Sequence, residues 1–212
     1  MKHLGILLSG RGSNFLAIAD AIDRGQIEDA EISIVISNRA EADGIVAAMG
    51  RGLATRVIEG RGRKRAEQDA EIVACLREHG VELVCLAGYM RLLSPEFIAA
   101  FPNAILNIHP SLLPSFPGLD AQAQALAYGV GISGCTVHFV DEQLDHGVIV
   151  LQRAVPVLQG DDEEALSARI LEQEHLAYPE AISRVLSGNY AIVDRRYVAR
   201  ASQNAALIEE AK

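Results

Sequence analysis

The sequence lacks tryptophan and has only three cysteines in 212 residues, Cys75, Cys85 and Cys135. An odd number of cysteines, without a C-x-x-C pair or neighbouring metal ligands, argues against a disulfide scaffold and against a metal site. Each thiol stands in an apolar stretch, which is typical of buried cysteines in a reducing compartment. We therefore expect a cytoplasmic protein that binds no metal.

Long apolar runs and an excess of positive charge are also missing. No run approaches the roughly 18–20 apolar residues of a membrane-spanning helix, so we expect no membrane association. Lysine and arginine total 19 against 28 acidic residues, for a net charge of −9, and the isoelectric point is near 5.1. Nucleic-acid binding requires a basic face, so nucleic acid is not expected as a partner.

Half of the residues are hydrophobic, which indicates a globular protein. The first half alternates short apolar runs with segments of helical periodicity. The expected strands are 4–10, 31–38, 54–60 and 81–88, and the expected helices are 13–25, 41–52 and 64–80. This alternation is typical of βαβ units around a buried parallel sheet.

After residue 90 the pattern is less regular. Ser94 followed by Pro95 predicts a helix start. Further strands are expected at 104–110, 133–140 and 147–157, the last two as a possible antiparallel pair, and further helices at 121–129 and 161–188. Pro179 is expected to kink or break the last helix. No repeat or linker interrupts the chain, so we predict one domain over 1–212 with an α/β, Rossmann-like, mostly parallel sheet flanked by helices.

The segment SGRGSN (9–14) lies between the first expected strand and helix. Backbone amides of such a turn, together with a helix N-terminus, can bind a phosphate group. The dinucleotide fingerprint would need glycine where Phe15 stands, so a monophosphate fits better than NAD. Ser13 and Asn14 at the helix start favour phosphate binding over a turn with a purely structural role.

The segment LNIHPSLLPSFPG (106–118) places Asn107 and His109 on one face of a strand, because they alternate with two apolar residues. Pro110 then holds the chain extended. An amide and an imidazole side by side at a strand end suit the stabilisation of an oxyanion in acyl transfer.

A charged imidazole needs a nearby acid, and the segment VDEQLDHG (140–147) offers Asp141, Glu142 and Asp145. Spacing alone does not choose among these three acids. For His3, His79, His138 and His175 we favour ordinary structural roles.

Together the segments SGRGSN, LAGYMRLLSP (86–95), NIHPSLLPSFPG, TVHFVDEQLDHG (136–147) and QEHLAYP (173–179) resemble those of the phosphoribosylglycinamide formyltransferases. The resemblance covers residues 4–190, in order. It implies transfer of a formyl group from 10-formyltetrahydrofolate, as co-substrate, to the amine of glycinamide ribonucleotide in purine biosynthesis. It also implies small-molecule substrates, no metal, and a monomer or homodimer.

The resemblance further assigns roles to individual residues. The catalytic residues would be Asn107, His109 and Asp145. The ribonucleotide would be bound by Gly12, Ser13, Asn14 and Glu174, and the folate by Arg65, Met90, Arg91, Leu92, Leu93 and Asp141.

Glu174 also falls on the apolar stripe of its expected helix, where a carboxylate needs a partner. The substrate ammonium and an arginine elsewhere in the chain are both candidates. The sequence departs from the family at 118–126, where usual histidines are missing, and at His146, which replaces a common glycine.

Three other functions are weighed against this one. A formyltetrahydrofolate hydrolase would use the same site with water as acceptor, but such relatives usually carry an additional N-terminal domain. A methionyl-tRNA formyltransferase would need an RNA-binding domain. A non-catalytic phosphate-binding module would explain SGRGSN alone. The absence of a G-x-S-x-G elbow argues against a covalent acyl-enzyme.

Overall fold

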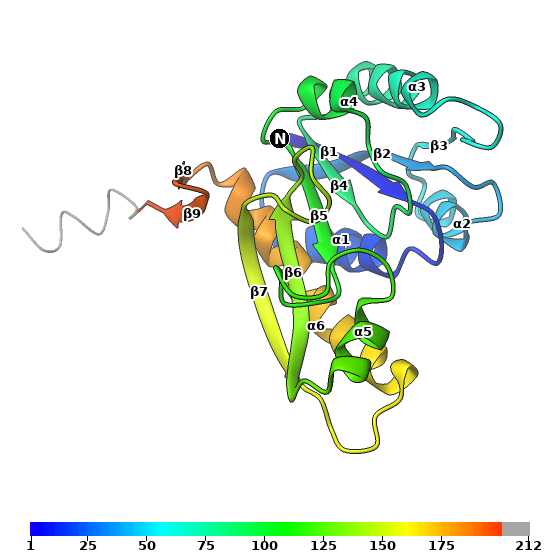
Figure 1. Ribbon diagram of the computed structural model, residues 1–212. Helices are drawn as coiled ribbons and strands as arrows, with labels where there is room; N and C mark the ends of the chain where they lie inside the picture. Colours follow the sequence, from blue (N-terminus) through cyan, green and yellow to red (C-terminus); the bar gives the residue numbers. More distant parts are fainter. Residues whose placement is uncertain (201–212) are drawn as a thin grey trace, which may run out of the picture.

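A computed structural model describes residues 1–200, and residues 201–212, which the single-domain prediction includes, lie outside the described part. The main sheet has seven strands in the order β3-β2-β1-β4-β5-β6-β7, and a separate hairpin pairs β8 with β9 (Figure 1). The strands are β1 (Lys2–Leu8), β2 (Ala30–Ser37), β3 (Thr55–Val57), β4 (Leu83–Leu86), β5 (Ile105–His109), β6 (Ile132–Phe139), β7 (Ile149–Pro156), β8 (Tyr190–Val193) and β9 (Arg196–Ala199).

The helices lie where the sequence predicts them, with ends shifted by a few residues at most. They are α1 (Ser13–Asp23), α2 (Asp43–Gly50), α3 (Arg65–Glu78), α4 (Pro95–Ala100), α5 (Ala121–Tyr128) and α6 (Glu163–Leu186). The expected start of α4 is confirmed, since the Ser94 side chain accepts a hydrogen bond from the Phe97 amide and Pro95 opens the helix. Within residues 1–200 no helix combines the length and hydropathy needed to cross a membrane.

Strands β1 to β5 are mutually parallel, whereas β6 runs antiparallel to both β5 and β7. The predicted mostly parallel sheet with an antiparallel pair in the C-terminal half is therefore confirmed. β4 shows why the parallel part forms: all four of its residues are buried, as expected for a strand covered by helices on both faces.

Two hydrophobic cores separate the sheet from its helices. On one face, Phe15 of α1, Ile45 of α2 and Ile170 of α6 join a common cluster of buried side chains. On the other face, Ile72 of α3 and Phe97 of α4 belong to a second cluster. The second cluster also includes Leu7 of β1, Val84 of β4 and Ile105 of β5.

Helix α6 continues through Pro179 to Leu186, so the expected break is wrong. A proline inside a helix costs about 3 kcal/mol. Full burial of a large apolar side chain contributes about 1.5–3 kcal/mol, and Ile170, Tyr178 and Ile182 on this helix have no exposed area. Packing against the sheet therefore outweighs the proline.

The hairpin β8–β9 was not predicted. Its first residue, Tyr190, stacks on Phe139 of β6 with ring centroids 6.1 Å apart, and on Tyr197 of β9 at 4.8 Å. The tyrosine stack joins the hairpin to the end of β6, and β9 also contacts the edge strand β7.

Candidate active site

Three polar side chains meet where β5 and β6 lie side by side: His109 and His138 are buried, and Asn107 is half-buried. Asn107 of β5 is opposite His138 of β6 in the antiparallel register. Nδ2 of Asn107 lies 3.2 Å from Nε2 of His138. His109, two residues further along β5, has its side chain on the same face, and its residue is only 5% exposed.

The surroundings of His138 define its protonation. Its Nδ1 lies 2.8 Å from the carbonyl oxygen of Phe139, which only accepts, so Nδ1 carries a hydrogen. Burial lowers the pKa of His138 below its ordinary value of 6.5, and this outweighs the opposing effects of Phe139 and Asp145. The neutral ring therefore offers the lone pair of Nε2, and the Asn107 amide donates to it. This bond fixes which end of the Asn107 side chain is the N–H donor.

Asp145 approaches from the loop between β6 and β7. Its Oδ2 lies 3.4 Å from Nδ1 of His109, and its Oδ1 lies 3.8 Å from Nε2 of His138. Oδ2 also accepts a 2.7 Å hydrogen bond from the Gly118 amide. Only 8% of the Asp145 side chain is exposed, so the carboxylate faces the two imidazoles in a largely dry environment.

The other nitrogen of His109, Nε2, lies 2.8 Å from the carbonyl oxygen of Phe116. Both ring nitrogens thus face oxygen acceptors, and an imidazolium can donate to both. The segment 111–118 therefore closes over the end of β5 and contacts His109 directly.

The Asp145 loop can fold this tightly because of Gly147. A Cβ atom at Gly147 would lie 1.8 Å from the carbonyl oxygen of Phe139, so any other residue would push the loop away from β6. Asp145 itself adopts a left-handed backbone with φ of 49°, a conformation that asparagine and aspartate tolerate better than most residues.

The glycine loop ends at α1, as predicted. Gly12 is left-handed with φ of 75°, and no side chain caps the helix, so first-turn amides remain available to a ligand. A Cβ at Gly12 would lie 2.7 Å from Cα of Gly44, which shows how closely the loop packs on α2.

Glu174 is buried in α6, as its position on the apolar stripe predicts, with 7% exposure. Its partner within residues 1–200 is Asn14, whose Nδ2 donates to Oε2 at 2.7 Å, so the arginine considered from the sequence is not found. Burial raises the pKa of Glu174 above 4.5, although the Asn14 bond opposes this. Oδ1 of Asn14 is buried without a partner in the described residues.

The segment predicted to bind folate adjoins the glycine loop. The Met90 amide donates to Oγ of Ser9 at 2.8 Å. Met90 is 63% and Leu92 54% exposed, whereas Leu93 is buried. Exposed apolar side chains beside a polar site are available to a flat apolar ligand.

The two arginines and the aspartate assigned to folate binding lie on three different segments of the chain. Arg91 Nη1 lies 3.4 Å from the Gly60 carbonyl. Gly60 begins the basic segment GRGRKR (60–65), whose last residue, Arg65, is exposed at the start of α3. Asp141 bonds His146, with Oδ2 and Nδ1 2.9 Å apart.

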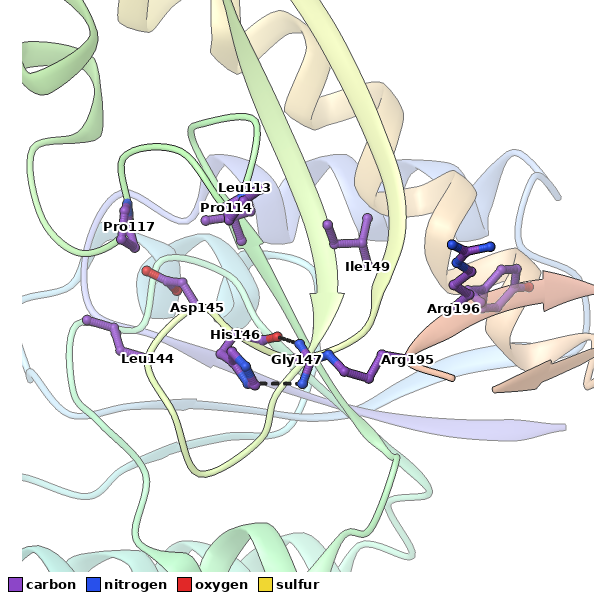
Figure 2. Close-up of a pocket in the computed structure, with 11 residues that line it drawn as sticks. Leu113, Pro114, Pro117, Leu144, Asp145, His146, Gly147, Ile149, Arg195 and Arg196 are labelled. Carbon is purple, nitrogen blue, oxygen red and sulfur yellow. Dashed lines mark hydrogen bonds between the residues drawn. The ribbon is translucent and has the colours of Figure 1, made fainter. Parts of the chain in front are cut away.

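A cavity of about 690 Å³ lies between the Asp145 loop, the proline-rich segment and the β8–β9 hairpin. Figure 2 shows Asp145 and His146 on one side and Arg195 on the other, with Pro114 and Pro117 above. None of the residues 90–93 lines this cavity. Within residues 1–200 no group of three histidines, cysteines or acids is placed to hold a metal ion.

The structure thus brings Asn107, His109 and Asp145 together, and it places Asn14 against Glu174. The sequence interpretation missed His138, for which a structural role was favoured. The register of 133–140 against 104–110 was the signal that could have found it, because pairing Asn107 with residue 138 puts both side chains on one face.

Comparisons with known proteins find relatives that cover most of this chain. The formyl transferase family model matches residues 2–182. The phosphoribosylglycinamide formyltransferase of Escherichia coli K12 is 42% identical over 187 residues, covering 88% of each chain. The solved structure of glycinamide ribonucleotide transformylase 1 from Symbiobacterium toebii has 48% identity and a TM-score of 0.92, over 95% of each chain.

A trifunctional purine biosynthetic protein of Drosophila pseudoobscura pseudoobscura is 48% identical over 189 residues, or 88% of this chain. The chain spans 14% of the length of that relative.

Proposed function

The chain belongs to the formyl transferase family, and from this premise we propose that it transfers the formyl group of 10-formyltetrahydrofolate to the amine of glycinamide ribonucleotide, a step of purine biosynthesis. The observation that carries the proposal is the convergence of Asn107, His109 and Asp145 at the end of β5. The relatives named above, two of which match over nearly their whole length, support the choice of substrates.

The amine attacks the formyl carbon directly, and the resulting oxyanion accepts hydrogen bonds from Asn107 and His109. In the structure, His109 Nε2 is bonded to the Phe116 carbonyl. We therefore expect the formyl oxygen to take over this acceptor position as segment 111–118 moves aside. Asp145 lies 3.4 Å from His109 and stabilises it as it donates to the oxyanion. One proton of the attacking amine passes through His109 or an ordered water to the folate nitrogen that carried the formyl group, so that this nitrogen can leave. Collapse of the intermediate releases tetrahydrofolate.

The ribonucleotide phosphate is assigned to Gly12, Ser13 and Asn14, because the α1 N-terminus has backbone amides without a capping side chain. Its ammonium is assigned to Glu174. A buried carboxylate with a raised pKa gains a favourable partner when a cation binds beside it.

The folate is assigned to Met90, Arg91, Leu92 and Leu93, with Asp141 from the loop and Arg65 at the anionic end. The exposed apolar area of Met90 and Leu92 supports this assignment. The chain is expected to act as one domain in the cytoplasm, where its three free thiols would stay reduced. Because all of these residues come from one chain, a monomer or a homodimer would suffice. The chemistry requires no metal, and neither nucleic acid nor membrane is expected as a partner.

The test is a spectrophotometric assay of tetrahydrofolate release with and without glycinamide ribonucleotide. We expect release to depend on the ribonucleotide. Equal release without it would instead favour a hydrolase, and phosphate binding without any release would favour a non-catalytic module.

The variants His109→Ala and Asp145→Asn should each lose at least 100-fold in kcat while substrate binding persists, because each removes stabilisation of the charged intermediate. His79→Ala is the matched control, since within residues 1–200 the His79 side chain forms a hydrogen bond only with the Cys75 carbonyl, at the end of α3. Undiminished turnover in either active-site variant would end the assignment of these residues.

A further inference from the structure

The loop that carries Asp145 is also held from outside the site, by the turn of the β8–β9 hairpin. Nη2 of Arg195 donates to the carbonyl oxygen of His146 at 2.5 Å, and Nη1 lies 3.3 Å from Nδ1 of the same histidine (Figure 2). His146 follows Asp145 directly in the chain, so this contact acts on the peptide unit beside the carboxylate-bearing residue.

The hairpin turn places an arginine where the backbone disfavours one. Asp194 and Arg195 join the two strands, with φ of 46° and 62°. A two-residue turn with both φ positive usually carries glycine at the second position, because a Cβ is strained there. Strained backbone persists where the surroundings hold it, and it concentrates at functional sites. Glycine at 195 would relieve the strain but would remove the guanidinium that reaches His146.

The hairpin is a firm base for this contact. Tyr190 stacks on Phe139, the last residue of β6, and the hydroxyl of Tyr197 donates to the Arg184 carbonyl at 3.2 Å. The position of Arg195 is therefore tied to β6 and α6, the elements that also carry His138 and Glu174.

The Asp145 loop has need of an external contact. Asp145 is left-handed, and the neighbouring Leu144 is 55% exposed, so little apolar burial holds this end of the loop. On the inner side, the carboxylate is held by the Gly118 amide. Gly118 belongs to the segment that contacts His109, and the proposed function expects this segment to move aside when substrate binds. Arg195 is a restraint that does not depend on that segment.

We propose that Arg195 is a positioning residue for formyl transfer: by binding the His146 carbonyl, it keeps the Asp145 carboxylate against His109 while segment 111–118 rearranges. This inference rests on the proposed function. Arg195 acts through Asp145, and the side chain itself does not touch the reacting atoms.

The experiment compares three variants in the ribonucleotide-dependent assay. Arg195→Ala should lower kcat about fivefold and leave KM for glycinamide ribonucleotide nearly unchanged, because the loss affects the charge balance in the transition state. Arg195→Lys, which can still donate to the carbonyl, should recover most of the loss. Arg196→Ala is the matched control, because Arg196 is on the same hairpin but is directed away from His146 (Figure 2).

A double-mutant cycle separates positioning from a general effect on the fold. In an Asp145→Asn background, Arg195→Ala should have no further effect on kcat, because the residue it positions is already impaired. The thermal unfolding midpoints of Arg195→Ala and Arg196→Ala should match. Wild-type kcat in Arg195→Ala, an equal fall in Arg196→Ala, a rise in KM alone, or an additive effect in the Asp145→Asn background would each overturn the proposal. The ribonucleotide-dependent turnover of the wild-type protein tests the proposed function, whereas the variants test the role of Arg195. The two proposals can therefore fail separately.

Discussion

Replacing His138 with phenylalanine tests whether this histidine orients the Asn107 amide. The substitution keeps an aromatic ring but removes the acceptor at Nε2, which lies 3.2 Å from Asn107 Nδ2. One amide N–H then loses its partner in a site where His138 is only 2% exposed, and the amide can rotate.

The size of the effect follows from this one bond. A hydrogen bond between neutral groups contributes roughly 0.5–1.5 kcal/mol, which corresponds to about a 2- to 13-fold change in rate. Loss of an oxyanion donor altogether costs about 100- to 1,000-fold. We therefore expect kcat of His138→Phe to fall about tenfold, and that of Asn107→Ala to fall considerably further.

His138→Gln is the conservative comparison, because Oε1 of glutamine stands about as far from Cβ as Nε2 of histidine and also accepts. It should retain most of the activity, whereas a phenylalanine variant with wild-type kcat at pH 7.5 would refute the reasoning.

The pH dependence gives a second measurement. Because burial lowers the pKa of His138 below 6.5, the neutral acceptor is present at and above pH 6.5. It is lost as pH falls through the lowered pKa, when Nε2 gains a hydrogen that faces the Asn107 amide. The same sign holds for stability, since the unfolded chain takes up this proton first and the free energy of unfolding declines below pH 6.5. In His138→Gln, kcat should fall less steeply at acid pH than in the wild-type protein, because glutamine does not gain a proton there.

Two further predictions concern the proposed ribonucleotide site. Glu174→Gln should raise the free energy of unfolding at pH 7 but not near pH 4. The raised pKa of Glu174 means that this residue stabilises the wild-type protein below pH 4.5, and that the stabilisation is lost as pH rises through the pKa of the folded state. Urea titrations of both proteins at the two pH values measure this, and an equal difference in stability at both would contradict it. The same variant should raise KM for the ribonucleotide, because the ammonium loses its counter-charge. Gly12→Ala should lower stability by about 1–3 kcal/mol, because its φ of 75° strains any other residue and its Cβ would meet Gly44. It should also raise KM for the ribonucleotide with a smaller change in kcat, and an unchanged KM would separate the loop from phosphate binding.

The order and type of the main elements follow from the sequence, because buried parallel strands such as 83–86 read as continuous apolar runs. Short-range signals also located α4, where Ser94 and Pro95 specify the helix start. These features depend on neighbours a few residues apart, and the sequence records such neighbours directly.

Features that depend on distant contacts could not be predicted. The Asn14–Glu174 bond joins residues 160 positions apart, and nothing local in either segment indicates it. Spacing alone left Asp141, Glu142 and Asp145 open, and only the family resemblance singled out Asp145. The loop conformation supplies the physical reason: Gly147 allows the close approach to Phe139, whereas Asp141 turns to His146. Pro179 misled the helix assignment, because its local cost is smaller than the burial of its neighbours.

The antiparallel pairing of β6 with β5 makes the site sensitive to the number of residues in β6 as well as to their identity. Because alternate residues of a strand point to opposite faces, adding or deleting a single residue between 132 and 138 would turn His138 into the opposite core and place an apolar side chain against Asn107. The connection between β7 and α6 is exposed at 158–160, and these residues carry no alternation of faces. Among homologous sequences, insertions should therefore occur in that connection and be absent from β6.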